Sequence, residues 1–189
     1  MLNARAAIAG LPALILLSDD ARLPDPRAAA NHLPPGSLII LRHRDPAKRR
    51  DLAFALKEIA HARNLLLSVA NDVALAHAVG ADGVHFSQNA MGEAVAARRG
   101  RASWLISVAT HSLAALARAR RVGADAALLG TVFASKSHPG QPGLGAARAR
   151  LLAQMAPLPV YALGGINGAH ARLLAGSAFA GLAAIGALQ

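Results

Sequence analysis

The chain has 189 residues, of which 54% are hydrophobic, with a formal net charge of +10 and no cysteine. This length suits one domain with a sizeable core, and the lack of cysteine excludes disulfides, thiol nucleophiles and thiolate metal sites. Aromatic residues make up only 3% of the chain, which disfavours the stacking of unpaired bases, so we expect no nucleic-acid partner. No apolar stretch approaches the roughly 20 residues that span a bilayer, so we expect a cytoplasmic protein without a membrane partner.

Short apolar runs recur along the chain, and each has the length of a buried strand. The runs lie at 13–18, 37–42, 65–70, 83–86, 104–109, 126–130, 159–165 and 181–186. Stretches with helical spacing separate them, such as 46–62 and the segment between Ser112, a predicted N-cap, and Gly123, a predicted C′ residue. Continuously apolar strands that alternate with helices indicate parallel strands covered by helices.

The eight runs favour an α/β fold, a compact single-domain (β/α)8 TIM barrel over residues 1–189, with an open flavodoxin-like sheet as the alternative. The last run ends just before Gln189, so we expect the barrel to lack its final closing helix. The N-terminal segment or another subunit would then cover the groove, because large apolar patches are usually interaction sites. We therefore expect a homo-oligomer.

In such a barrel the residues that follow each strand form the site face. Arg42 and Arg44, two residues apart in an extended segment, project to the same side and can grip a phosphate or carboxylate. A solvated charge cluster explains these two residues as well. Asn71 and Asp72 can bind a ligand or cap the next helix, and Gln88 is a further candidate after the run 83–86.

His111 follows the run 104–109 and stands at the start of a helix. The positive end of a helix favours the neutral imidazole, which can accept a proton. His111 is therefore a candidate general base, although a helix-capping or merely exposed histidine fits the same position.

The segment "LLGTVFASKSHPGQPGLG" (128–145) turns from an apolar run into hydroxyls, a lysine, a histidine, glycines and prolines. Pro139 and Pro142 exclude a helix, so we expect a loop that leaves a buried strand, where α/β proteins carry their chemistry. Glycines recur in "LGGI" (163–166) and "AIGAL" (184–188). Glycine lets backbone amides approach an oxyanion, and loops after the seventh and eighth strands of many barrels hold phosphate.

Taken in order, these stretches resemble the thiamine phosphate synthase and TenI superfamily from about Leu14 to Leu188. The matching pieces are "LILLSDD", "LRHR", "VANDVALA", "GADGVHFSQ", "SVATHS", "LLGTVFASKSHPG", "ALGGI" and "AIGAL". The resemblance implies a (β/α)8 barrel that acts on the phosphorylated thiazole of thiamine biosynthesis. Synthases of this family join that thiazole to a pyrimidine diphosphate with loss of diphosphate, assisted by magnesium. The TenI branch moves a proton to aromatise the thiazole.

The resemblance also assigns binding residues. It places the phosphate site at Gly164, Gly165, Ile185 and Gly186, with glycine where a serine is common. The synthase loop has two hydroxyl residues spaced by one and followed by a lysine. Here Ser135 and Ser137 keep the hydroxyls and His138 replaces the lysine, unless Lys136 reaches the same anion from one residue earlier.

The magnesium ligands of the synthases are only partly matched. Those enzymes use an acid of an Asn-Asp pair after the third strand and a second acid after the fourth. An ungapped comparison puts Asn71 at the first acid and Ala90 at the second, and a shift of one residue makes Asn71 and Asp72 the pair. Nothing restores the second acid, because the neighbour of Ala90 is Asn89. One acid and an amide hold a hard cation poorly.

The segments Arg42-x-Arg44 and "SVATHS" match the TenI branch, with His111 at its proton-transferring histidine, whereas Ile40 replaces a glutamine of the synthases. We therefore expect a TenI-like thiazole tautomerase that binds a thiazole phosphate and requires no cofactor. One alternative is a thiamine phosphate synthase (thiamine-phosphate diphosphorylase) that uses Mg²⁺, with Asp72 as a ligand, and hydroxymethylpyrimidine diphosphate as second substrate. The other is a non-catalytic regulatory protein that binds thiazole phosphate or thiamine phosphate.

Overall fold

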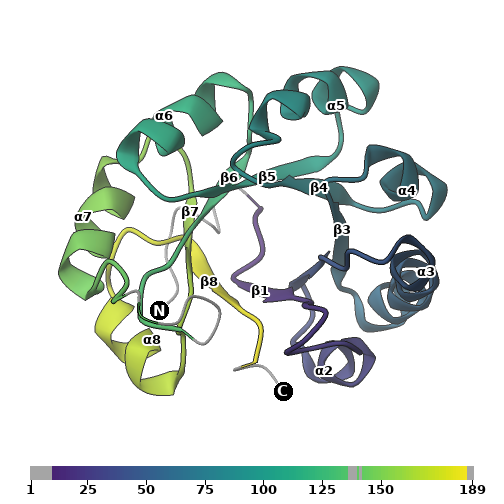
Figure 1. The fold of residues 1–189 in the computed structure, drawn as a ribbon, viewed down its shortest axis with the longest axis horizontal. Coiled ribbons are helices and arrows are strands. Elements are labelled where there is room, and N and C mark those ends of the chain that lie inside the picture. Colours follow the sequence, from purple (N-terminus) through teal and green to yellow (C-terminus); the bar gives the residue numbers. More distant parts are fainter. Residues whose placement is uncertain (1–9, 136–139, 141, 187–189) are drawn as a thin grey trace.

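The computed structural model describes residues 10–135, 140 and 142–186. In this part of the chain, eight parallel strands close into a barrel in chain order, and helices cover the outside of the strands (Figure 1). Pairing of β8 with β1 completes the ring. The expected (β/α)8 barrel is confirmed, and the open sheet is wrong, because an open sheet would leave these two strands as unpaired edges.

The strands and helices occupy the predicted places. The strands are β1 Leu14–Leu17, β2 Leu38–Leu41, β3 Leu66–Ala70, β4 Gly83–Phe86, β5 Leu105–Thr110, β6 Ala126–Leu129, β7 Val160–Leu163 and β8 Gly181–Ala184. The helices are α2 Arg27–His32, α3 Pro46–Arg63, α4 Val73–Ala78, the 3₁₀ helix η1 Met91–Glu93, α5 Ala94–Gly100, α6 Leu113–Arg121, α7 Ala146–Met155 and α8 Gly168–Leu174.

Local signals in the sequence fix where the helices begin and end. The Ser112 hydroxyl accepts a hydrogen bond from the Ala115 amide at 3.2 Å and so caps α6, as predicted. Gly123 follows the last residues of that helix with a φ of +78°, a conformation that glycine adopts without strain. These caps stop each helix where the next buried strand has to start.

Each strand is buried on both faces, which explains why the apolar runs are continuous. Residues such as Ile15, Ile40 and Leu128 fill the barrel interior, while alternate residues such as Leu16 and Ile39 pack beneath the helices. The interior and the outer layer therefore form two apolar clusters separated by the sheet.

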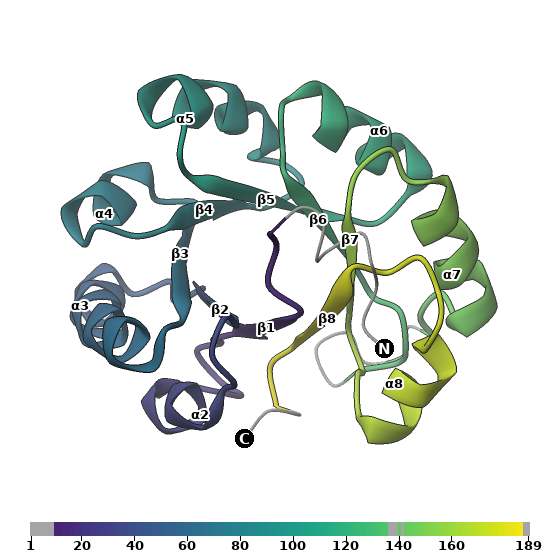
Figure 2. The same ribbon diagram turned by 180° about the vertical axis from the view of Figure 1, so that it is seen from behind.

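The sector of the helix ring between α8 and α2 contains no helix over β8 and β1 in the described residues (Figures 1 and 2). This agrees with the expectation that no helix follows β8 up to Gly186. No helix among the described residues has both the length and the apolar character needed to cross a membrane.

Candidate functional site

At the carboxyl end of the strands, a buried serine and histidine fix the backbone between β2 and α3. The Ser18 hydroxyl accepts a hydrogen bond from the Arg42 amide at 2.8 Å and lies 2.9 Å from Nδ1 of His43. Nε2 of His43 lies 3.2 Å from the Pro24 carbonyl, which can only accept, so Nε2 carries the proton of the neutral ring and the serine donates to Nδ1. Sequence reasoning missed both side chains, although a hydroxyl at a strand end was a visible signal.

Within the described residues, the one ionic partner of Arg42 is distant. Its guanidinium lies 3.5 Å from the Asp19 carboxylate, which already forms a 2.6 Å ion pair with Arg22. The side-chain bond from Arg22, with the backbone amides of Arg22 and Ala21, holds the pKa of Asp19 far below its usual range despite partial burial. Although its side chain is partly exposed, partial burial lowers the pKa of Arg42. Arg42 is thus a partly desolvated cation that a bound anion would stabilise.

Arg44 lies two residues further along, on the other side of the buried His43. Arg42 and Arg44 are both exposed, in agreement with the two-residue spacing of an extended segment. The Arg44 amide donates to Asp20 at 3.3 Å, and its guanidinium forms no ion pair within the described residues. Both side chains remain available to a ligand at the rim of the barrel.

Asn71 and Asp72 are committed to local structure. The Asn71 side-chain oxygen accepts from the Ser87 amide at 2.8 Å. One Asp72 oxygen caps α4 by accepting from the Leu75 amide at 2.9 Å, and the other pairs with Arg49 at 2.7 Å. Of the two roles that the sequence left open for Asp72, helix capping is the one formed here.

These residues do not fit a magnesium site of the kind expected for a synthase. Among the described residues there is no group of three or more histidines and acids that could hold a metal ion. Both oxygens of Asp72 already have donors, the Asn71 oxygen faces a backbone amide, and the side chain of Ala90 has no donor atom. A hard cation would find one shared carboxylate where it needs several oxygen ligands.

The His111 ring is oriented so that one nitrogen can accept a proton. Its Nδ1 lies 2.6 Å from the Gly130 carbonyl, which can only accept, so Nδ1 carries the proton and Nε2 of the neutral ring keeps its lone pair. The His111 amide donates to the Gln88 side chain at 3.1 Å, and the Gln88 carbonyl accepts from Arg118 at 2.8 Å. Gln88 therefore contacts His111, and its predicted role in ligand binding remains a prediction.

Gly164 and Gly165 are glycines because the loop after β6 packs directly on them. Their φ angles are +97° and +63°, and a Cβ on Gly165 would lie 2.4 Å from the Ala134 carbonyl oxygen. The Val132 amide donates to the Leu163 carbonyl at 2.9 Å and holds this loop beside β7. Larger residues at either glycine would push the two loops apart.

Backbone amides without acceptors gather at the ends of β7 and β8. The four predicted phosphate-binding residues are Gly164, Gly165, Ile185 and Gly186. No backbone or side-chain acceptor within the described residues receives a hydrogen bond from these amides. The register that pairs Leu163 with Ala183 sets the two short segments side by side. Unpaired N–H groups in one place are suited to bind an oxyanion.

His170 connects the two loops and was not predicted. It lies in α8, its ring stacks on Phe133 with centroids 3.9 Å apart, and its Nδ1 donates to the Gly165 carbonyl at 2.5 Å. In the sequence, the one sign of this role is the position of His170 in the first turn of the helix that follows the glycine pair.

The loop after β6 is described only in part. The Ser135 hydroxyl is buried and has no hydrogen-bond partner within the described residues. The other predicted residues of this loop, Lys136, Ser137 and His138, lie outside the described residues, so their predicted roles remain predictions.

Below the rim, a histidine is buried in the barrel interior. His85 on β4 hydrogen-bonds through Nδ1 with the Ser107 hydroxyl at 2.9 Å. Burial, together with the positive charge of Arg42, lowers its pKa from 6.5 to about 3. His85 is therefore neutral near pH 7, and its ring lies within range of the positive charge of Arg42.

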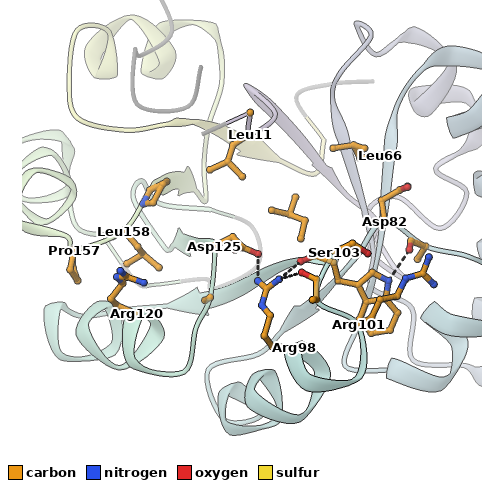
Figure 3. A pocket seen from close by; sticks show the side chains of 17 residues that line it. Leu11, Leu66, Asp82, Arg98, Arg101, Ser103, Arg120, Asp125, Pro157 and Leu158 are labelled. Atoms are coloured by element: carbon orange, nitrogen blue, oxygen red, sulfur yellow. Dashed lines mark hydrogen bonds and ion pairs between the residues drawn. The ribbon is translucent and has the colours of Figure 1, made fainter. Parts of the chain in front are cut away.

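The other end of the barrel holds a cavity of about 870 Å³ (Figure 3). Its lining includes Arg98, Arg120 and Asp125, from segments that precede or lie beside the starts of the strands. None of the predicted site residues lines this cavity.

Comparison with known proteins assigns the family. The family model for thiamine monophosphate synthase matches residues 16–188. A thiamine-phosphate synthase of Alcanivorax borkumensis is 34% identical over 185 residues, covering 94% of this chain and 85% of that protein. One of Methanoculleus marisnigri is 35% identical over 144 residues, covering 74% and 68%. A solved thiamine phosphate pyrophosphorylase from Pyrococcus furiosus has a TM-score of 0.78 at 24% identity, covering 97% of this chain and 88% of the other. The chain therefore belongs to the thiamine monophosphate synthase family.

Proposed function

We propose that this protein is a thiamine-phosphate synthase, which joins a thiazole phosphate to hydroxymethylpyrimidine diphosphate and releases diphosphate. Relatives that carry this name, at 34% and 35% identity, support the assignment. The sequence favoured the TenI-like tautomerase instead, and the relatives give that preference no support.

The observation that carries the proposal is the presence of two separate groups of anion-binding donors on one rim. The first contains the guanidiniums of Arg42 and Arg44 at the end of β2. The second contains the amides of Gly165 and Gly186, at the ends of β7 and β8, which donate to no acceptor among residues that the structure describes. A synthase has to hold a monophosphate and a diphosphate at the same time, whereas a tautomerase holds a single phosphate.

In this reaction each group of donors has its own task. The amides at the ends of β7 and β8 bind the thiazole phosphate and orient the ring towards the barrel centre. The bond from the thiazole to the pyrimidine forms as the bond to the diphosphate breaks, and the electron pair of the broken bond leaves with the diphosphate. The guanidiniums of Arg42 and Arg44 stabilise the charge that develops on that leaving group.

A turnover assay tests the proposal. The native protein, given both substrates, should release thiamine phosphate and diphosphate in equal amounts. Arg42→Ala should lower kcat/KM by about tenfold or more, because a charge-assisted hydrogen bond to the diphosphate is lost. Arg50→Ala is the matched control, since Arg50 lies over the exposed Phe54 ring on α3. Failure of the native protein to form any thiamine phosphate would reject the synthase assignment.

A second candidate function, thiazole proton transfer, rests on the orientation of His111. The bond from Nδ1 to the Gly130 carbonyl leaves Nε2 as an acceptor. If His111 is the base, His111→Ala should lower kcat for thiazole tautomerisation by about 10²–10⁴-fold, with the exposed His61→Ala as control. An unchanged rate would exclude proton transfer by His111. Binding of thiazole phosphate without turnover in either assay would leave the regulatory alternative.

A further inference from the structure

Arg49, in the first turn of α3, is held between the ends of two neighbouring strands. One terminal nitrogen pairs with the Asp72 carboxylate at 2.7 Å, and the other donates to the His43 carbonyl at 3.3 Å. The Arg49 Nε is buried and donates to no acceptor within the described residues. The guanidinium is therefore fixed in place and still has an unused donor.

The contact with His43 joins this third guanidinium to the segment that carries the other two. His43 is the residue between Arg42 and Arg44, so the backbone carbonyl that holds Arg49 belongs to the segment that presents those side chains. Three arginines thus belong to, or contact, the segment that follows β2. Guanidiniums bind phosphate oxygens through paired hydrogen bonds, and a diphosphate carries enough charge to engage several of them.

The ion pair with Arg49 also changes what Asp72 can bind. This is the only acid of the Asn71-Asp72 pair, and its second oxygen caps α4 through the Leu75 amide. A divalent cation on this carboxylate would have to lie close to the fixed guanidinium, and like charges at that range repel. The positive charge of the Arg49 guanidinium therefore already occupies the position beside Asp72 where a cation would bind.

We propose that Arg49 supplies, beside Asp72, the positive charge that a divalent cation supplies in metal-dependent diphosphate chemistry, so that this chain binds free diphosphate rather than its magnesium complex. The identity of the diphosphate as the leaving group rests on the proposed function. The grip itself requires only an anion with the charge and geometry of diphosphate at the end of β2.

Calorimetric titration of the native protein with inorganic pyrophosphate tests this inference. The protein should bind pyrophosphate in the presence of EDTA, and an excess of Mg²⁺ should fail to tighten the binding. Arg49→Met should weaken binding in EDTA by about tenfold or more, because a charged donor is lost. Arg50→Met removes the same charge one residue away, where the guanidinium lies over the exposed Phe54 ring, and should change affinity by less than about twofold.

Three results would overturn the proposal: tightening of pyrophosphate binding to the native protein by Mg²⁺, an absence of binding in EDTA, or equal losses in Arg49→Met and Arg50→Met. Thermal unfolding of each variant shows whether it is folded, and Arg49→Lys, which keeps the charge, should retain more affinity than Arg49→Met. If Arg49→Met does not fold, the native titration alone decides.

The turnover assay separates this inference from the proposed function. Synthase turnover that requires Mg²⁺, with Mg²⁺-dependent pyrophosphate binding, would overturn the role of Arg49 and leave the function standing. Metal-free pyrophosphate binding that requires Arg49, without synthase turnover, would reject the function and leave this anion site standing.

Discussion

The two ends of the barrel use charge in opposite ways. At the amino end of the strands, Asp82 exchanges hydrogen bonds with the Leu67 backbone, donating from its amide at 2.8 Å and accepting through its side chain at 2.9 Å. Asp125 makes the same pair of bonds to Ile106, at 2.8 Å and 2.7 Å. Each aspartate also forms an ion pair with a helix that covers the barrel. Asp82 pairs with Lys57 of α3, and Asp125 pairs with Arg98 of α5. At this end the carboxylates have their partners within the fold.

At the carboxyl end, several hydrogen-bond donors lack a close acceptor in the described part of the chain. Arg42 has a single ion pair at 3.5 Å, Arg49 has an unused buried Nε, and the amides of Gly165 and Gly186 have no acceptor in the described part of the chain. The cavity of about 870 Å³ nevertheless lies at the amino end (Figure 3). Unsatisfied donors therefore identify the candidate site of this barrel, whereas cavity size does not.

The largest effect on stability is expected at the amino end. Asp125→Ala should lower the free energy of unfolding by about 3 kcal/mol, because the Ile106 amide and the Arg98 guanidinium lose a charged acceptor. Urea unfolding measures the change, and Asp51→Ala, on the exposed face of α3, should cost less than about 0.5 kcal/mol. Pyrophosphate affinity should be unaffected. A large loss of pyrophosphate affinity in Asp125→Ala would indicate that the anion binds at the amino end of the strands and would contradict a site at the carboxyl end.

Stability should also depend on one of the two glycine positions at the rim. Gly165→Ala should lower the free energy of unfolding by about 2 kcal/mol, because its φ of +63° disfavours a Cβ and the Ala134 carbonyl blocks the space. Gly186→Ala should cost much less, because nothing lies within 4 Å of the added Cβ. A larger side chain at 165 would therefore disturb the fold as well as any bound phosphate. Equal costs for the two alanine variants would show that the loop after β6 does not pack on Gly165 in solution.

Acid should destabilise the protein through His85. Its pKa is lowered by burial from 6.5 to about 3 in the fold, so between these values the unfolded chain binds a proton that the folded chain does not. Lowering the pH therefore favours unfolding, by roughly 2 kcal/mol between about pH 7 and about pH 5. His85→Gln should remove this part of the pH dependence in urea unfolding. An identical pH dependence in the variant would mean that His85 is not buried in neutral form.

The sequence was sufficient for the fold because its signals are local. Apolar runs bounded by caps such as Ser112 and Gly123 gave the strands and helices in order, and eight parallel strands leave few arrangements other than a closed barrel. Arg42 and the glycine pair at 164–165 were predicted as site residues in the same way, because the ends of apolar runs and the positions of glycines can be read directly from the sequence.

The rest of the site depends on contacts between distant segments. The pairing of Asp72 with Arg49 and of Ser18 with His43 joins residues more than 20 positions apart, and only the barrel register brings them together. His170 reaches Phe133 for the same reason. The sequence left Asp72 open as a ligand or a cap, and it did not show the contact with Arg49 that occupies the second oxygen of this carboxylate.

The most direct test of the account is the affinity for inorganic pyrophosphate of two variants that remove the same charge from opposite ends of the barrel. Arg42→Ala acts at the site rim, and Arg120→Ala acts on the lining of the cavity in Figure 3. Calorimetry should show about tenfold weaker binding for Arg42→Ala and a change of less than about twofold for Arg120→Ala. The reverse order, or equal losses in the two variants, would contradict the claim that the anion site lies at the carboxyl end of the strands.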